Sequence, residues 1–324
     1  MTAGSPGFHQ GPRVTWESDY HSPALAAEIV ALLRGAALVL DGTLGGGGHA
    51  AALLEAGVER VIGVDRDPEA LAAASERLAA AAVRGRFAAY QGNYAAIDAI
   101  PAIADLRFNG ILLDLGISSH QIDDASRGFS FREGAPLDMR MGGASDAAPG
   151  AGELLGSASE DELTRIFRQY GDEPRAARLA REIVRRRATR DFRTSDDLVG
   201  AIRGALGART GPSDFARLFQ AVRIAVNEEL SGLEQALPAL RDRLVPGGTL
   251  AVIAYHSGED RLVKHAFRAW STDCICPPRL PMCACGGDHA LGETVTRRAI
   301  VASADELAHN PRARSAKLRA WRAR

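Results

Sequence analysis

Short apolar runs alternate with amphipathic segments over the first third of the chain. The segments between the runs place their apolar residues at helical spacing, and Asp67 followed by Pro68 is a typical helix start. Continuous apolar strands separated by helices are typical of a parallel sheet that is covered on both faces. The pattern therefore predicts an α/β fold with a doubly wound, Rossmann-like sheet. The predicted strands of this region are residues 37–40, 60–65, 87–90 and 110–115.

The strand pattern stops in the middle of the chain. Helix-periodic segments at residues 160–170, 174–187 and 195–205 indicate an inserted helical subdomain there. Strand character returns at residues 249–255, after a segment that we predict as one long helix over residues 215–244, with Pro238 as its candidate kink. The predicted division is a disordered extension over residues 1–19, a first part of the sheet domain over residues 20–126, the helical insertion over residues 127–214, and a second part of the sheet domain over residues 215–324.

Acidic and basic residues are almost balanced. The 39 Lys and Arg against 40 Asp and Glu leave a formal net charge of −1, so no overall field attracts a polyanion. Basic residues nevertheless cluster in two segments. Each cluster alone is typical of a solvated helix face or a disordered tail, but their coincidence on a neutral chain favours RNA. The clusters are Arg181, Arg185, Arg186, Arg187, Arg190 and Arg193, and Arg312, Arg314, Lys317, Arg319, Arg322 and Arg324 in the C-terminal tail.

The sequence predicts neither membrane insertion nor secretion. No apolar run approaches the roughly eighteen residues of a membrane span, and residues 1–13 lack the charged-then-apolar order of a secretion signal. We therefore expect a cytoplasmic protein without a membrane partner. The oligomeric state stays open, with a dimer as one option.

A run of glycines follows the first predicted strand. Residues 41–50 read Asp-Gly-Thr-Leu-Gly-Gly-Gly-Gly-His-Ala, so a strand ends and a helix begins there. Glycines let the backbone turn sharply and bring its N–H groups against a ligand. The Gly-x-Gly-x-x-Ala spacing, with Asp65 after the second strand, fits both S-adenosylmethionine and NAD. A carboxylate at Asp41 would repel a pyrophosphate but could accept hydrogen bonds from an ammonium group, which favours S-adenosylmethionine.

Polar residues also follow two further predicted strands, at the edge where the loops of such a sheet converge. Asp114 ends an otherwise apolar strand, and this position favours ligand binding over a capping role. After the last predicted strand, Ser257 is the predicted N-cap of a helix, with Glu259 in its first turn. Capping does not account for His256, which is either a core histidine or a donor to a bound base.

All the cysteines lie within one short segment. In a cytoplasmic protein this grouping indicates a tetrahedral zinc knuckle rather than disulfides, although the gap within each pair is tighter than usual. Four zinc ligands and four unliganded thiols are both open interpretations. The candidate ligands are Cys274, Cys276, Cys283 and Cys285.

Segments along almost the whole chain together resemble one family, the bacterial S-adenosylmethionine-dependent methyltransferases that modify N4 of a cytosine in small-subunit ribosomal RNA. The resemblance implies a Rossmann-like methyltransferase sheet, S-adenosylmethionine as the cofactor, and 16S rRNA or the small ribosomal subunit as the partner. The matching segments are residues 21–25, 41–49, 65–68, 110–121, 127–141, 219–224, 227–230, 256–261 and 310–316.

The resemblance also implies the cofactor contacts. Tyr94 and Tyr255 stand where relatives often carry Phe, and Gly258 stands where they carry Leu. Residues 211–214 read Gly-Pro-Ser-Asp in place of the typical His-Pro-Ala-Thr, so no RNA contact is carried over to that loop. The implied contacts are the backbone of Gly47, Gly48 and His49 for the methionine end, Asp65 for the ribose diol, Tyr94 beside the adenine, and Asp114 with Gln121 near the purine and the sulfonium.

Methyl transfer to an exocyclic amine suits these residues. Because the amine of cytosine is conjugated with the ring, it is a poor nucleophile that an enzyme must align while accepting a hydrogen bond from it. We expect Asp114 as the main acceptor. Ser118 and Ser119 are expected to orient the amine, and His256 to contact the base. No covalent intermediate is required, so no catalytic cysteine is expected.

Two other functions stay open on the sequence. An NAD-dependent oxidoreductase could use the same glycine loop, and a non-catalytic RNA-binding assembly factor could keep the fold as a scaffold. Retention of Asp65 and Asp114 favours catalysis. Phe129 and Phe131 are candidates both for core packing and for stacking on an unpaired base.

Overall fold

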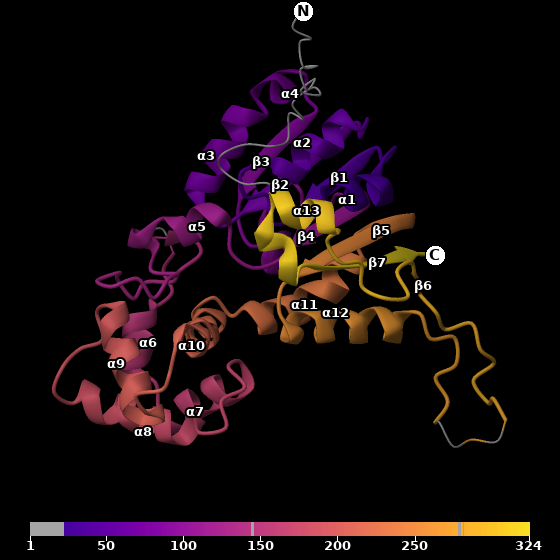
Figure 1. Ribbon diagram of the computed structural model, residues 1–324. Helices are drawn as coiled ribbons and strands as arrows, with labels where there is room; N and C mark the ends of the chain where they lie inside the picture. Colours follow the sequence, from indigo (N-terminus) through magenta and orange to yellow (C-terminus); the bar gives the residue numbers. More distant parts are fainter. Residues whose placement is uncertain (1–22, 144–145, 278–279, 281) are drawn as a thin grey trace, which may run out of the picture.

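A seven-stranded sheet forms the centre of the computed structural model, which describes residues 23–143, 146–277, 280 and 282–324 (Figure 1). The predicted extension over residues 1–19 lies outside the described residues. The strand order is β3-β2-β1-β4-β5-β7-β6, with β1 to β5 parallel and β7 antiparallel to both of its neighbours. The strands are β1 (Leu38–Asp41), β2 (Arg60–Asp65), β3 (Phe87–Gln91), β4 (Phe108–Asp114), β5 (Leu244–Ala254), β6 (Gly292–Thr294) and β7 (Lys317–Ala323).

Helices cover both faces of the sheet, which confirms the doubly wound fold. Side chains of a strand alternate between its faces, so Val39 joins the core under α1 and α2 while Leu40 joins the core under α11 and α12. No helix within the described residues is both long and apolar enough to cross a membrane. The covering elements are α1 (Ala26–Leu33), α2 (Gly48–Glu55), α3 (Pro68–Arg77), α4 (Ala79–Val83), η1 (Tyr94–Ala99), α11 (Glu229–Arg241), α12 (Ser257–Trp270), α13 (Ala304–His309) and η4 (Pro311–Ser315).

A helical unit with a core of its own lies beside the sheet (Figure 1). The predicted helices of this region are confirmed as α7, α8 and α9, and α6 adds a short helix before them. The core extends beyond residue 214, because α10 contributes Phe215, Leu218 and Val222 to it. The elements of this region are α5 (Ser119–Asp123), η2 (Ala125–Arg127), α6 (Ala151–Ser157), α7 (Glu160–Gln169), α8 (Ala176–Arg187), α9 (Ser195–Leu206) and α10 (Pro212–Val226).

The prediction of one long helix over residues 215–244 is wrong. The chain forms α10 and α11 instead, and the break falls at Asn227 and Glu228 rather than at Pro238. Asn227 donates from its side chain to the Met139 carbonyl at 2.7 Å, and Glu228 adopts a left-handed φ of 52°. A long-range hydrogen bond therefore ends α10, whereas Pro238 is accommodated within α11.

The interpretation of the basic C-terminal segment as a disordered tail is also wrong. Lys317–Ala323 forms β7, which pairs with β5 over six residues and with β6 on its other side. Leu318 and Trp321 are fully buried. Leu318 joins the core on one face of the sheet and Trp321 the core on the other, so the strand is buried from both sides. Arg319 forms an ion pair with Asp260 at 2.7 Å instead of extending freely into solvent.

Replacing Trp321 with Ala should lower the free energy of unfolding by about 3–5 kcal/mol, because a large buried ring is lost from an interior strand of the sheet. The Trp321 ring packs edge-on against Trp270 at 5.3 Å, and its N–H donates to Ser271 Oγ at 3.1 Å. Urea unfolding measures the change. Arg322→Ala on the same strand is the control, since its exposed side chain should contribute less than about 0.5 kcal/mol. Equal effects of the two variants would contradict a structural role for the strand's buried face.

Candidate active site

A cavity of about 620 Å³ opens at the carboxyl ends of the parallel strands. The sheet side contributes the glycine loop together with Asp65 and Asp114. The helical side contributes Phe131 and Asn227, and Ser315 lines the cavity from near the C-terminus. The loops that follow β1, β2, β4 and β5 therefore meet at one site, as a doubly wound sheet requires.

The glycine loop turns tightly between β1 and α2. Gly47 has a φ of 75°, and a Cβ at this position would lie 3.2 Å from Ala74 Cβ, so a larger residue is strained here. The Gly47 amide donates to the Leu44 carbonyl at 2.9 Å, within the loop itself. Gly48 and His49 begin α2 and line the cavity. Gly47 therefore shapes the turn that presents the next two residues.

Three carboxylates lie at the ends of neighbouring strands. Burial raises the pKa of Asp41 to about 8, and the charges of Asp114 and Asp65 act in the same direction. Asp41 Oδ2 is buried and has no hydrogen-bond partner among the described residues. Burial also raises the pKa of Asp65, although its oxygens accept the amides of Gly45 at 2.7 Å and Asp67 at 2.9 Å. The end of the sheet thus concentrates carboxyl groups, and Asp41 holds its proton near pH 7.

Asp114 is held in place by groups from three loops. The Tyr255 hydroxyl donates to Asp114 Oδ1 at 2.9 Å, and the Asp114 amide donates to Thr43 Oγ1 at 2.6 Å. His49 Nδ1 lies 3.7 Å from Asp114 Oδ2. Burial lowers the pKa of His49 to about 4, so its ring is neutral near pH 7, with Nε2 placed to donate to the Ala24 carbonyl at 2.9 Å. The orientation of the carboxylate is therefore fixed before any ligand arrives.

The remaining predicted cofactor contacts lie around the same cavity. Tyr94 lines it, and burial raises the pKa of the Tyr94 phenol, which stays neutral. Ser118 and Gln121 also line it and form a capping box at the start of α5. Ser118 Oγ accepts the Gln121 amide at 3.2 Å, while Gln121 Oε1 accepts the Ser118 amide at 3.0 Å. The side chain of Ser119 lies outside the described part of the chain.

Sequence reasoning missed a buried ionic network beside Gln121. Asp67 caps α3 as predicted, because its Oδ1 accepts the Glu69 amide at 3.1 Å. Its Oδ2 also accepts Gln121 Nε2 at 2.9 Å and Arg127 Nη1 at 2.8 Å. Arg127 is 8% exposed and donates in addition to the Met141 carbonyl at 2.8 Å. An N-cap aspartate has no sequence feature that points to a distant arginine, so no signal could have revealed this network.

A second missed link lies at the junction of α10 and α11. Asn227 is buried, and its Oδ1 accepts the Met141 amide at 2.8 Å while its Nδ2 donates to the Met139 carbonyl. Met139 and Glu228 have φ values of 61° and 52°, which are strained for residues with a Cβ. Glu228 lines the cavity. Strained backbone of this kind is characteristic of sites where the structure must position particular groups.

His256 lies in a cluster of charged side chains. Its Nδ1 accepts the Gly258 amide at 3.2 Å and caps α12, so the prediction of Ser257 as the cap is wrong. Its Nε2 lies 3.3 Å from Glu259 Oε1, without the alignment of a hydrogen bond. Glu259 and Tyr255 line the cavity, whereas His256 is not among the described residues that do. Any influence of His256 on a ligand therefore passes through these neighbours.

Both phenylalanines whose roles the sequence left open line the cavity. Phe129 is half-buried and also packs against the core of the helical unit. Phe131 is 37% exposed and lines the cavity, with Phe215 and Phe219 edge-on to its ring at 5.9 Å and 6.0 Å. Phe131 is thus the more accessible of the two rings.

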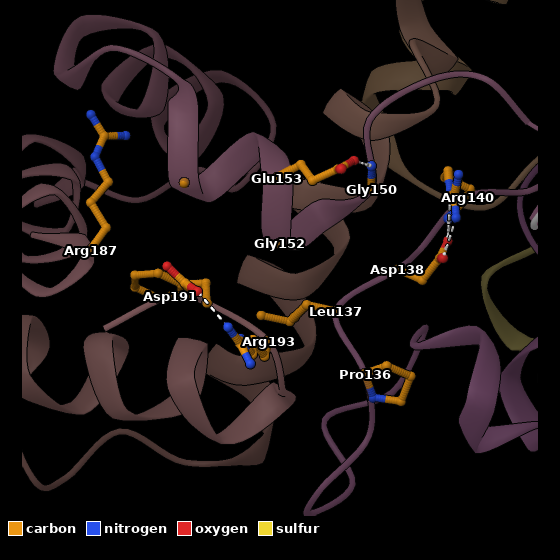
Figure 2. Close-up of a pocket in the computed structure, with 12 residues that line it drawn as sticks. Pro136, Leu137, Asp138, Arg140, Gly150, Gly152, Glu153, Arg187, Asp191 and Arg193 are labelled. Carbon is orange, nitrogen blue, oxygen red and sulfur yellow. Dashed lines mark hydrogen bonds and ion pairs between the residues drawn. The ribbon is translucent and has the colours of Figure 1, made fainter. Parts of the chain in front are cut away.

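A second cavity, of about 570 Å³, lies in the helical unit and includes arginines of the first basic cluster (Figure 2). Arg187 donates to the carbonyl oxygens of Leu155 and Ala158 at the end of α6, at 3.2 Å and 2.6 Å. Arg193 forms an ion pair with Asp191 at 2.8 Å. These arginines have local structural partners, and RNA binding by the cluster stays a prediction. Further pairs are Arg185 and Arg186 with Glu182, Arg190 with Asp197, and Arg312 with Asp123.

Comparison with known proteins identifies the family. A family model described as the MraW methylase family matches residues 18–324. A curated relative from Gemmatimonas aurantiaca, named ribosomal RNA small subunit methyltransferase H, is 64% identical over 303 residues, which cover 94% of this chain and 95% of the relative. A relative of the same name from Heliobacterium modesticaldum is 47% identical over 310 residues, which cover 93% of this chain and 97% of the relative. The match includes the sheet, the helical unit and every residue that lines the cavity, and the chain belongs to the MraW methylase family.

Proposed function

We propose that the protein transfers a methyl group from S-adenosylmethionine to the N4 amine of a cytosine in the decoding region of 16S ribosomal RNA. The family supports methyl transfer, and the names of the relatives support small-subunit ribosomal RNA as the substrate class. The observation that carries the choice of cofactor is the pair of carboxyl groups, Asp65 and Asp114, that line the cavity at the ends of the parallel strands. This substrate would also place the protein in the cytoplasm.

Negative charge at the strand ends favours a cationic ligand over an anionic one. Asp65 and Asp114, which both line the cavity, would repel the pyrophosphate of NAD. S-adenosylmethionine instead carries an ammonium group and a sulfonium, both of which such a site attracts. The charge arrangement therefore argues against the oxidoreductase alternative.

The residues around the cavity fit the parts of this cofactor. We assign the methionine end to the backbone of Gly48 and His49 in the turn that Gly47 shapes, and the ribose diol to Asp65. Each carboxylate oxygen can accept two hydrogen bonds, so the amides already bound to Asp65 leave room for the diol. We place Tyr94 and Gln121 beside the adenosine. When bound, the cofactor supplies a methyl group attached to a positively charged sulfur.

The chain's own residues orient the amine that is to be methylated. Asp114 accepts an N–H hydrogen bond from this amine and stabilises the positive charge that develops on it. Tyr255 fixes the Asp114 carboxylate, so little reorganisation is required during the reaction. Ser118 orients the amine from the start of α5, and the role expected for Ser119 stays a prediction. His256, first expected as a direct base contact, is assigned an indirect role, because it packs against Glu259 and caps the helix after Tyr255.

The cytosine must leave its stack to reach Asp114, because the amine is otherwise held within folded RNA. The exposed ring of Phe131 at the rim offers a surface on which an extruded base can stack. Arg312 also lines the cavity and is available for phosphate, since its ion pair with Asp123 is exposed and therefore weak.

Methyl transfer and cofactor binding together test the proposal against its rivals. The purified protein is incubated with labelled S-adenosylmethionine and either naked 16S rRNA or small ribosomal subunits, and the nucleosides are then separated after digestion. N4-methylcytidine at a single decoding-region site is the expected product. Thermal melting with S-adenosylhomocysteine and with NAD should show stabilisation by the first alone. Binding of RNA and cofactor without transfer would support the assembly-factor alternative, and stabilisation by NAD would support the oxidoreductase.

Replacing Asp114 with Asn should lower kcat by about 100-fold to 1000-fold, because the acceptor loses its negative charge. The affinity for S-adenosylmethionine should change only a few-fold, which calorimetry can measure beside single-turnover transfer. Asp105→Asn, an exposed residue on the same domain, is the matched control and should leave both quantities unchanged. Normal turnover in the Asp114 variant would remove this carboxylate from the chemistry.

Replacing Asp41 with Asn should change how stability depends on pH. Because the pKa of Asp41 is about 8 in the folded chain and 3.8 ordinarily, the folded state holds a proton that the unfolded state releases between these values. The contribution of Asp41 to the unfolding free energy therefore falls as pH rises from about 4 to about 8, by up to about 1.4 kcal/mol per pH unit.

The Asn variant lacks this contribution, so its stability relative to the native protein should increase steadily from pH 5.5 to pH 8. Urea unfolding at several pH values measures the difference. Asp105→Asn serves again as the control and should give a constant difference. Parallel pH profiles for the native protein and the Asp41 variant would show that folding does not raise the pKa of this carboxyl.

A further inference from the structure

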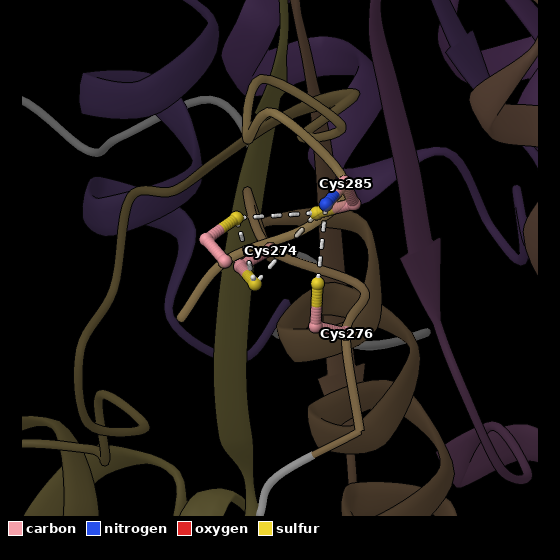
Figure 3. A group of neighbouring side chains, drawn as sticks. Cys274, Cys276 and Cys285 are labelled. Carbon is pink, nitrogen blue, oxygen red and sulfur yellow. Dashed lines mark hydrogen bonds between the residues drawn. The ribbon is translucent and has the colours of Figure 1, made fainter. Parts of the chain in front are cut away.

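The segment between α12 and β6 brings four thiols together without forming a disulfide. Cys274 Sγ lies 3.7 Å from Cys283 Sγ and 3.7 Å from Cys285 Sγ, and Cys283 Sγ lies 3.6 Å from Cys285 Sγ (Figure 3). The sulfur of Cys276 completes the group, in which all four lie within 4.8 Å of one another. Two Cys-x-Cys segments that are separated in the sequence therefore converge on one point.

The sulfur separations match those of four thiolates around a single metal ion. A disulfide would require about 2.05 Å between two sulfurs. Four thiolates around a single Zn²⁺, each about 2.3 Å from the metal at the corners of a tetrahedron, would be about 3.8 Å apart. An iron–sulfur cluster spreads its cysteines over several iron atoms and so holds their sulfurs farther apart. We propose that Cys274, Cys276, Cys283 and Cys285 bind one Zn²⁺ ion in a closed, structural site.

Backbone groups of the segment hold the sulfur of Cys276 in place. The amides of Ala284 and Cys285 both donate to Cys276 Sγ, each at 3.2 Å. Such N–H donors orient a metal ligand, as the groups around known metal sites do. The chain is thus folded around the sulfur as an acceptor, which an inert thiol does not require.

Large apolar side chains lie on the surface of the described part of the segment instead of in a core. Ile275 is 66% exposed and Met282 is 81% exposed, although residues of this type are normally buried. The segment joins the sheet domain through contacts such as the hydrogen bond from the Leu291 amide to the Trp270 carbonyl at 2.8 Å. Small units without a core commonly gain their stability from a bound metal. Zinc supplies this constraint here and fixes Ile275 and Met282 on the surface of an extended loop.

Four protein ligands leave no open position on the metal, so the site has no direct part in chemistry. The segment projects from the side of the sheet where β6 lies, away from the helical unit (Figure 1). Zinc binding is therefore independent of the proposed methyl transfer, and each can fail without the other.

Metal analysis of the full-length protein, purified without chelators or added metal, tests the site. We expect about one zinc per chain by inductively coupled plasma mass spectrometry. Cys276→Ser and Cys285→Ser should each reduce the zinc content several-fold. Ile275→Ser and Met282→Ser change exposed neighbours that are not ligands, and these controls should keep their zinc. Circular dichroism of every variant shows whether the sheet domain is still folded.

Cobalt and thiol measurements make the result decisive. Reconstitution with Co²⁺ should produce the visible absorption of a tetrahedral tetrathiolate, and this absorption should disappear when Zn²⁺ is added. Thiol reagent should react with the four cysteines only after zinc is removed, and limited proteolysis should then cut within residues 271–291. A folded, metal-free protein with four reactive thiols would overturn the proposal. Bound iron in place of zinc, or disulfides between the two pairs, would overturn it as well.

Discussion

Carboxylates that are forced together at the ends of adjacent parallel strands are the constraint on which the site depends. Parallel strands end at the same edge of the sheet. The carboxyl groups at the ends of β1, β2 and β4 therefore lie close together, and these are Asp41, Asp65 and Asp114. Backbone amides donate hydrogen bonds to Asp65, a hydroxyl donates one to Asp114, and burial keeps Asp41 protonated near pH 7. The stability that is lost by crowding these groups becomes binding energy for a positively charged ligand.

The helical unit is coupled to this charged edge by buried polar contacts. Arg127, at the start of the insertion, pairs with Asp67, and the Asp67 amide donates to Asp65. A continuous chain of contacts thus runs from the insertion to the carboxylate that we assign to the ribose. Asn227 provides a second connection through Met141. Because an unpaired buried charge is costly, the helical unit has little freedom to move while the Arg127 pair is intact.

Periodicity made the fold predictable wherever one pattern held over a whole element. The strands β1 to β4 and the helices α7 to α9 have regular apolar spacing, and their positions agree with the expectations. The same reasoning failed at Asn227, where a side chain bonds to a carbonyl far away in sequence. It also failed at β7, where cationic residues stand among buried apolar ones without a regular period.

The positions of the site residues were predictable from the sheet topology, but their interaction partners were not. Residues at strand ends, such as Asp65 and Asp114, follow from topology, since loops of a doubly wound sheet must meet. The partners of these residues do not follow. Arg127 reaches Asp67 across 60 positions of sequence, and the role of His256 as a helix cap depends on its ring orientation. Only the folded chain reveals such pairings.

The position of β7 has a consequence for how the sheet is completed. β7 lies between β5 and β6, and η4 just before it carries Ser315 of the cavity wall. Until β7 pairs with β5, that edge of β5 is open to wrong partners. The sheet and the cavity wall are therefore completed by the same segment.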